Sequence, residues 1–217
     1  MVLDRRSRNS SRNSSRNTQQ EHRKAETMTT DASSTSESTT RDLTGAPAPT
    51  GERADLLDML AKHRHFLRFT TRDLTDEQAG LRTTASELCL GGLIKHVTSV
   101  ERSWAGFIVD GPSVMGDFTA MTEADWARRT DEFRMLPGET LAGVLADYAE
   151  AARRTDELVV GLPDLGATQP LPKAPWFEAD TEWSARRVLM HIVAETAQHA
   201  GHADIIRESL DGAKSMG

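Results

Sequence analysis

The stretch that decides the fold is RVLMHIVAETAQHAGHADIIR, residues 187–207 of the 217-residue chain. Its apolar and small side chains recur at helical spacing and form one stripe: Val188, Ile192, Val193, Thr196, Ala200, Ala203 and Ile206. Polar side chains with lone pairs lie beside the stripe: His191, Glu195, His199 and His202. Because burying such groups without partners is costly, the stretch predicts a helix that carries a polar site against the core.

Glu195 and His199 are the pair in this helix whose spacing suits metal binding. A step of four residues turns a helix by about 400°, so both side chains share one face and lie about 6 Å apart along the axis. Two such side chains can reach one divalent ion. A buried Glu–His hydrogen bond without a metal accounts for the same spacing, so the spacing alone leaves both alternatives open.

The overall composition restricts the class of partner. The net charge is −7, with +4 in residues 1–27 and −11 in the rest, which argues against nucleic acid or an anionic membrane as the main partner. The chain contains no run of 18 apolar residues, which is about the length needed to span a membrane. A single cysteine, Cys89, excludes an internal disulfide, fits a reducing cytoplasm, and is expected to be a small buried side chain rather than a nucleophile.

Residues 1–50 are predicted to be a disordered tail. The run RNSSRNSSRNT is of low complexity, and Ser, Thr, Pro and Gly continue to about residue 50, so the segment cannot bury enough apolar surface to fold. Met28 is an alternative start, in which case residues 1–27 would lie upstream of the true protein. The folded domain is expected at residues 51–212.

Helical periodicity dominates that domain, and no alternating strand pattern is present. Thr75 and Thr122 are expected to cap short helical turns, Pro137 to open a long helix at its first turn, and Gly161 to end it. The expected long helices cover residues 52–74, 86–109, 137–161 and 181–211. Together with the long connection at 110–136, this pattern predicts an all-α fold, a four-helix bundle with long crossover loops.

Several residues outside the last helix are candidates for a site. The small pair Gly91 and Gly92 would let a neighbouring helix or a ligand approach closely. Residues 162–182 hold four prolines and are expected to form an ordered crossing loop, whose Trp176 and Phe177 either wall a substrate pocket or cap the end of the bundle. The histidines of the first helix, His63 and His65, are interpreted as partly exposed helix residues without a ligand role.

His96 lies on the second helix at the edge of its apolar face. Taken alone, it fits a core-edge histidine better than a ligand. Combined with Glu195 and His199, it would complete a set of two nitrogens and one carboxylate with positions left open for water or substrate, as in catalytic zinc sites and other divalent sites.

Two segments resemble the DinB-like superfamily. The run ETAQHAGH, residues 195–202, resembles its last helix, which in many members reads His-x-x-x-His followed by x-Gly. The segment GGLIKHVTSVERSW, residues 91–104, is similar to a branch of small actinobacterial proteins of unknown function in that superfamily. The resemblance covers residues 52–212. It implies a four-helix bundle that holds a divalent metal, zinc or nickel, through three residues. It also implies thiol-dependent activity, as in mycothiol-dependent maleylpyruvate isomerase and in S-transferases that use mycothiol, bacillithiol or glutathione.

By motif position, the resemblance implies that the metal ligands are His96, Glu195 and His199. Many members have histidine where this chain has Glu195, but the mycothiol-dependent isomerase has glutamate there. His202 falls where many members have glutamine and would be a fourth ligand, a substrate contact or a proton donor. His191 lies a turn too early to be a ligand and is expected to support the site or the structure.

The function implied is that of a metal-dependent S-transferase or isomerase that uses a low-molecular-weight thiol, mycothiol first among them, on a small electrophile. Because the body of the chain is acidic, a cation such as Arg207 or Arg82 would have to offset the charge of the thiolate. The resemblance also allows a homodimer in the cytoplasm. The alternatives are a metal- or ligand-binding stress protein without catalysis, and a metal-dependent hydrolase built from the same three ligands.

Overall fold

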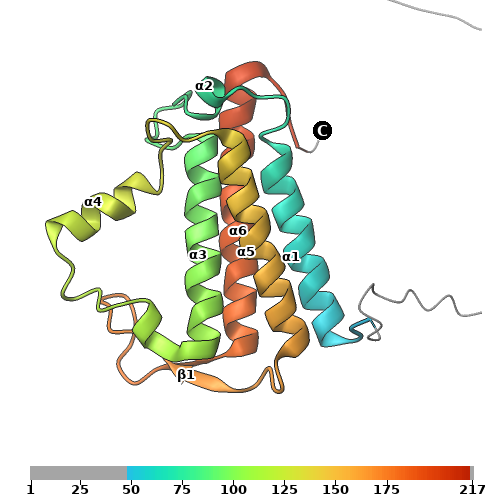
Figure 1. Ribbon diagram of the computed structural model, residues 1–217, viewed down its shortest axis with the longest axis vertical. Helices are drawn as coiled ribbons and strands as arrows, with labels where there is room; N and C mark the ends of the chain where they lie inside the picture. The colour runs from blue at the N-terminus through green and yellow to red at the C-terminus, as the bar shows by residue number, and fades with distance from the viewer. Residues whose placement is uncertain (1–47, 216–217) are drawn as a thin grey trace, which may run out of the picture. The chain divides into compact units, whose positions relative to one another are not determined.

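The computed structural model describes residues 48–215, and in this part of the chain four long helices pack side by side (Figure 1). They are α1 (Glu52–Phe69), α3 (Leu90–Asp110), α5 (Leu141–Gly161) and α6 (Ala185–Asp211). Helix α1 contacts α6, α6 contacts α3, α3 contacts α5, and α5 contacts α1, so the four helices close a ring around a shared core. The helical class predicted from the sequence is confirmed.

Two clusters of buried apolar side chains fill this ring, one toward each end of the helices. Leu60, Phe107 and Ile192 belong to the first cluster, and Leu67 and Ile94 to the second. All five side chains are almost fully buried. Burying a side chain of this kind contributes about 1.5–3 kcal/mol, so the two clusters supply the main driving force for packing the helices.

Short elements occupy the connections between the long helices. They are α2 (Asp76–Ala79), the 3₁₀ helix η1 (Gly111–Val114), α4 (Glu123–Asp131) and the antiparallel strands β1 (Thr168–Pro170) and β2 (Glu182–Ser184). Thr75 and Thr122 cap α2 and α4 through capping boxes, as the sequence predicts. Figure 1 shows α4 beside α3, outside the ring of long helices.

Four of the predicted helix limits were wrong, and side-chain hydrogen bonds explain the first three as follows. Helix α1 ends before residue 74 because the hydroxyls of Thr70 and Thr71 bond back to carbonyls in its last turn. Helix α3 starts at Leu90, not at residue 86, because Cys89 Sγ accepts a hydrogen bond from the Gly92 N–H. Helix α5 starts at Leu141 with Thr140 as its cap, and Pro137 lies in the preceding loop.

The start of α6 was also predicted too early. Residues 182–184 pair with β1 in an antiparallel register that matches Thr168 with Ser184, and the Ser184 hydroxyl then caps the helix at Arg187 N–H. The sequence analysis missed this short strand pair. The helix ends as expected, because Gly212 adopts the left-handed conformation (φ 79°) and its N–H bonds to the carbonyl of Glu208.

The glycine pair at the start of α3 lies against a loop backbone, which corrects the expectation of a helix or ligand there. A Cβ atom added to Gly92 would overlap the Phe133 carbonyl, and one added to Gly91 would overlap the Met135 side chain. Cys89 beside them is buried, as the sequence predicts. The small residues therefore admit the loop between α4 and α5.

The remaining predictions on the tail lie outside the described residues. Residues 1–47 and the alternative start at Met28 belong to that part of the chain. Among the helices of residues 48–215, none is long and apolar enough to cross a membrane.

Candidate metal centre

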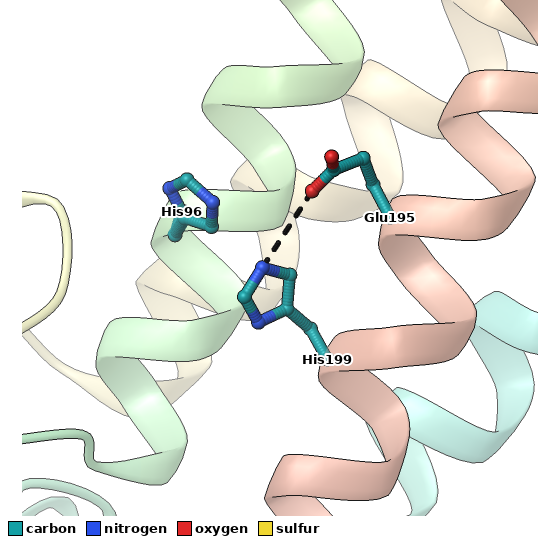
Figure 2. A group of neighbouring side chains, drawn as sticks. All are labelled: His96, Glu195 and His199. Carbon is teal, nitrogen blue, oxygen red and sulfur yellow. Dashed lines mark ion pairs between the residues drawn. The ribbon is translucent and has the colours of Figure 1, made fainter. Parts of the chain in front are cut away.

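The structure brings His96, Glu195 and His199 together, with one donor atom of each within 4.8 Å of the others (Figure 2). His96 comes from α3, whereas Glu195 and His199 stand one turn apart on α6. Because α3 and α6 are in contact and these side chains lie on their facing sides, segments separated by about a hundred residues converge. Both histidines are buried, and Glu195 is half-buried.

The distances inside this group are too long for hydrogen bonds. Glu195 Oε2 lies 3.7 Å from His199 Nε2, and the rings of His96 and His199 meet edge to face with centroids 4.8 Å apart. The hydrogen-bonded Glu–His pair that the sequence spacing also allowed is therefore not formed. The three donors face one another with their lone pairs available.

This donor set fits a divalent metal ion. Nitrogen and carboxylate ligands sit about 2.1 Å from zinc, which at tetrahedral angles places them about 3.4 Å apart. The observed group, at 3.7 Å for one pair and within 4.8 Å for all, reaches that geometry through small side-chain rotations. Two imidazoles and one carboxylate suit several divalent ions, including zinc and nickel.

The electrostatic environment keeps His199 in the form that a metal requires. Burial in the bundle, and then the neighbouring His96 and His202, lower the pKa of His199 to about 4. The imidazole is therefore neutral at pH 7, and a neutral ring is the metal-binding form.

Glu132 is a neighbour of the group that the sequence analysis missed. Its Oε2 lies 3.5 Å from His96 Nδ1, which is buried and has no well-formed hydrogen bond among the described residues. Ser99 Oγ donates to Glu132 Oε1 at 2.9 Å. Burial alone would raise the pKa of the Glu132 carboxyl, but the His96 and Ser99 contacts and the nearby Arg129 charge lower it below its usual value. No spacing rule links residue 132 to residue 96, so only the folded structure reveals the contact.

The other predicted site residues lie outside the three-donor group. His202 Nδ1 is 3.4 Å from His199 Nδ1, so His202 touches a donor without joining the set. Arg207 is buried, pairs with Asp211, and donates to the carbonyls of Thr70 and Arg72, which joins the end of α6 to the turn after α1. Arg82, on the surface, pairs with Glu87.

A pocket of about 420 Å³ opens beside the three donors. Its lining includes His96 and Glu195, together with the aromatic pair Trp176 and Phe177 that the sequence analysis singled out. The other lining residues are Ser99, Val100, Ser103, Trp104, Val114, Met115, Phe118, Arg129, Glu132 and His191. The pocket is therefore walled mainly by apolar and aromatic side chains, and two of the candidate ligands face it.

His191 forms part of an aromatic wall next to Glu195. Trp104 and Trp183 stack with centroids 5.1 Å apart, and the His191 ring meets both of them edge to face. Its Nε2 lies 3.6 Å from Glu195 Oε1. Burial lowers the pKa of His191, and the Glu195 charge opposes that shift only in part. His191 thus lies against the carboxylate of the candidate ligand Glu195.

The helical ring and the two-histidine, one-carboxylate group beside a pocket define the class: a four-helix bundle with a candidate metal centre. Residues 55–212 match the family model described as mycothiol S-transferase, and the chain belongs to that family. The resemblance to the DinB-like superfamily seen in the sequence is confirmed.

Comparison with solved structures supports the fold alone. The crystal structure of a conserved protein from Enterococcus faecalis is similar, with a TM-score of 0.58 and 12% sequence identity. The match covers 76% of this chain and 100% of that protein. No curated protein matches the chain.

Proposed function

We propose that the protein is a divalent-metal-dependent S-transferase that joins mycothiol to a small electrophile. The observation that carries this proposal is the convergence of His96, Glu195 and His199 beside a pocket, in a chain of the mycothiol S-transferase family. The family supports the thiol and the class of reaction, and the geometry of the three donors supports the metal.

His96 and His199 would hold the ion through ring nitrogens and Glu195 through a carboxylate oxygen. An ion bound there supplies Lewis acidity, which lowers the pKa of a thiol and favours the thiolate near neutral pH. The transfer forms a bond between sulfur and the electrophilic carbon and breaks the bond from that carbon to its leaving group, which departs with the electron pair. The proton of the thiol is released. An isomerase built on the same site would add the thiol and expel it again after rearrangement.

The pocket walls indicate which electrophiles would fit. The rings of Trp104, Phe118 and Trp176 offer flat apolar surfaces, which bind aromatic or unsaturated groups and exclude water. Among the described lining residues, Arg129 is the one cation, and its guanidinium carbon lies 5.4 Å from the centre of the Phe118 ring. We therefore expect a small apolar electrophile with an anionic group that Arg129 orients.

Two residues named from the sequence take different roles in this proposal. His202 touches the Nδ1 side of His199, away from the nitrogen nearest Glu195, and would orient that ring. Arg207 has its guanidinium engaged with Asp211 and two backbone carbonyls, so we give it no part in the reaction. Arg129 takes over the charge-compensating role expected of Arg207 or Arg82.

Elemental analysis of the purified protein tests the metal site directly. The wild type should carry about one zinc or nickel ion per chain, and His199→Ala should lose it. His65→Ala is a matched control, because His65 is an exposed histidine of α1, and it should keep the ion. If His96→Ala and His199→Ala both kept the metal content of the wild type, the proposed metal site would be contradicted.

Thiol consumption then tests the reaction. The wild type should consume mycothiol in the presence of an aromatic electrophile that carries a carboxylate, and His199→Ala should not. A protein that binds the ion but consumes no thiol with a panel of electrophiles would be a binding protein rather than a transferase.

A further inference from the structure

We propose that Glu132 is a positioning residue that holds the His96 ring for metal binding, and that the loop 131–139 keeps Glu132 in place. This inference rests on the metal site of the proposed function and is independent of the thiol chemistry. It assigns a role to a carboxylate that no sequence pattern singles out.

The geometry around His96 separates its two ring nitrogens. Nδ1 lies 3.5 Å from Glu132 Oε2, which leaves Nε2 for the other side of the ring. Figure 2 shows one nitrogen of His96 turned toward Glu195 and His199 and the other turned away from them. A carboxylate that accepts the N–H of a metal-binding histidine fixes both the tautomer and the direction of the ring.

Two further contacts fix this arrangement. Ser99, one turn along α3 from His96, donates its hydroxyl to Glu132 Oε1 at 2.9 Å. Phe133 stacks on the His96 ring with centroids 4.0 Å apart and planes 25° apart. The imidazole therefore has a carboxylate oxygen 3.5 Å from its edge, too far for a well-formed hydrogen bond, and an aromatic ring stacked on its face.

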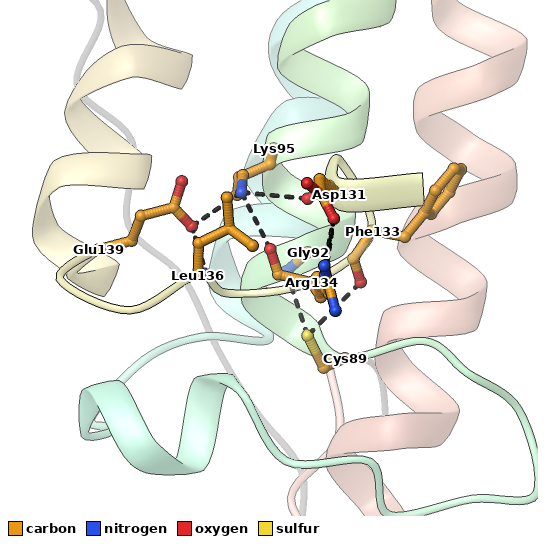
Figure 3. A network of polar contacts seen from close by, with 8 residues as sticks. All are labelled: Cys89, Gly92, Lys95, Asp131, Phe133, Arg134, Leu136 and Glu139. Carbon is orange, nitrogen blue, oxygen red and sulfur yellow. Dashed lines mark hydrogen bonds and ion pairs between the residues drawn. The ribbon is translucent and has the colours of Figure 1, made fainter. Parts of the chain in front are cut away.

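The loop that carries Glu132 and Phe133 is bonded to the start of α3 (Figure 3). Lys95 Nζ donates to the carbonyls of Asp131 and Arg134, at 3.2 and 2.9 Å, and to Glu139 Oε2 at 2.7 Å. Near the first turn of the helix, the Phe133 carbonyl lies against Gly92, where any side chain would overlap it. The loop therefore contacts two successive turns of the helix that bears His96.

These docking contacts do not use the carboxylate of Glu132. They come from the loop backbone, Lys95 and Glu139, whereas the hydrogen bond and the ion pair of the Glu132 carboxylate are with Ser99 and His96. Replacing the carboxylate should consequently leave the loop docked and the protein folded. If Glu132 had a purely structural role, replacing its carboxylate would instead undock the loop and destabilise the protein.

The test measures dissociation constants for Zn²⁺ and Ni²⁺ by competition with a chelator, and thermal unfolding of each metal-free protein. Glu132→Ala should bind about 10–100-fold more weakly than the wild type, as is typical when the hydrogen-bonding partner of a metal ligand is removed. Glu132→Gln should lose less, because its amide keeps an acceptor oxygen beside His96 Nδ1. Glu123→Gln removes the same charge from the exposed start of α4 and should bind like the wild type. The unfolding temperatures of all four metal-free proteins should agree.

Equal affinities in the wild type and Glu132→Ala would overturn the inference and leave the metal site standing. The inference would also be overturned if the affinity loss in Glu132→Ala came with an equivalent loss of metal-free stability, or if Glu123→Gln reproduced it. A wild type that binds neither ion overturns the metal site itself. A wild type that binds the ion but transfers no thiol would instead count against the proposed reaction and leave this inference standing.

Discussion

Two polar clusters with buried members share helix α3 and differ in whether their members are hydrogen-bonded to one another. The closed cluster consists of Arg64, Glu101 and Asp156. Arg64 reaches both oxygens of the fully buried Glu101, at 2.5 and 3.2 Å, and Asp156 Oδ1 at 2.8 Å. Burial alone would lower the pKa of Arg64, but the two carboxylates raise it above its usual value, so the guanidinium keeps its charge inside the bundle.

The open cluster consists of His96, Glu195 and His199, and its members are too far apart to hydrogen-bond. Buried polar groups without partners cost free energy, so a folded protein usually pairs them. The closed cluster follows that rule, and the open cluster, on the same helix, leaves donor atoms facing a shared point. This difference fits a structural role for the closed cluster and the proposed metal site at the open one.

Glu101→Ala should give the largest effect, because it leaves Arg64 charged and buried without its main partner. Breaking a buried pair in this way costs about 3–5 kcal/mol, which lowers the unfolding temperature by about 2–4 °C for each kcal/mol in a protein of this size. Urea and thermal unfolding of the metal-free protein measure the loss.

Replacing both partners, in Arg64→Met/Glu101→Leu, should recover most of the lost stability, because two apolar side chains remove the unpaired charge. A cost below about 1 kcal/mol for Glu101→Ala, within the range of exposed ion pairs, would contradict the division into a closed and an open cluster.

Adding metal should stabilise the protein through the open cluster. At a free Zn²⁺ concentration 100 times the dissociation constant, binding to the folded state alone adds about 2.7 kcal/mol to the free energy of unfolding. Thermal unfolding with zinc and with excess chelator measures the difference. His199→Ala should show none of it, whereas His65→Ala should respond like the wild type. An increment that survives in His199→Ala would place the binding elsewhere in the chain.

The sequence was sufficient for two of the three residues of the open cluster. The i, i+4 spacing of Glu195 and His199 on an amphipathic helix placed them on one face without any tertiary information. His96 needed the resemblance to a known family, because spacing within a helix does not say which helix will pack against it. The glycines at 161 and 212 allowed the ends of two helices to be predicted from the sequence. The starts at residues 90, 141 and 185 could not be predicted, because each depends on which of several nearby residues caps the helix.

Glu132 and Phe133 could not be predicted, for a physical reason. They lie at the end of the short helix α4 and in the loop that follows it. Hydrogen bonds from Lys95 and the absence of a side chain at Gly92 set the position of that loop. Such docking depends on contacts between residues about 40 positions apart and leaves no periodic pattern in the sequence. The glycine pair was recognised as a place of close approach, but the approaching group turned out to be this loop.

Gly92→Ala should weaken metal binding while leaving the global stability nearly unchanged, and its effect is the smallest that we predict. Alanine favours a helix over glycine by about 1 kcal/mol, but its Cβ would overlap the Phe133 carbonyl and displace the loop from α3. We expect the two effects on global stability to offset each other. The displaced loop would withdraw Phe133 and Glu132 from His96, and zinc affinity should fall by up to about tenfold, or about 1.4 kcal/mol.

Gly106→Ala is the matched control, because Gly106 lies on the same helix and a Cβ there would meet Val114 at an ordinary contact distance of 3.6 Å. It should gain helix stability and keep the zinc affinity of the wild type. If Gly92→Ala binds zinc as tightly as Gly106→Ala, the docked loop does not orient His96, and the open cluster is formed by α3 and α6 alone. If only Gly92→Ala loses affinity, a loop outside the ring of helices takes part in forming the open cluster, whereas α1, α3 and α5 supply all of the closed one.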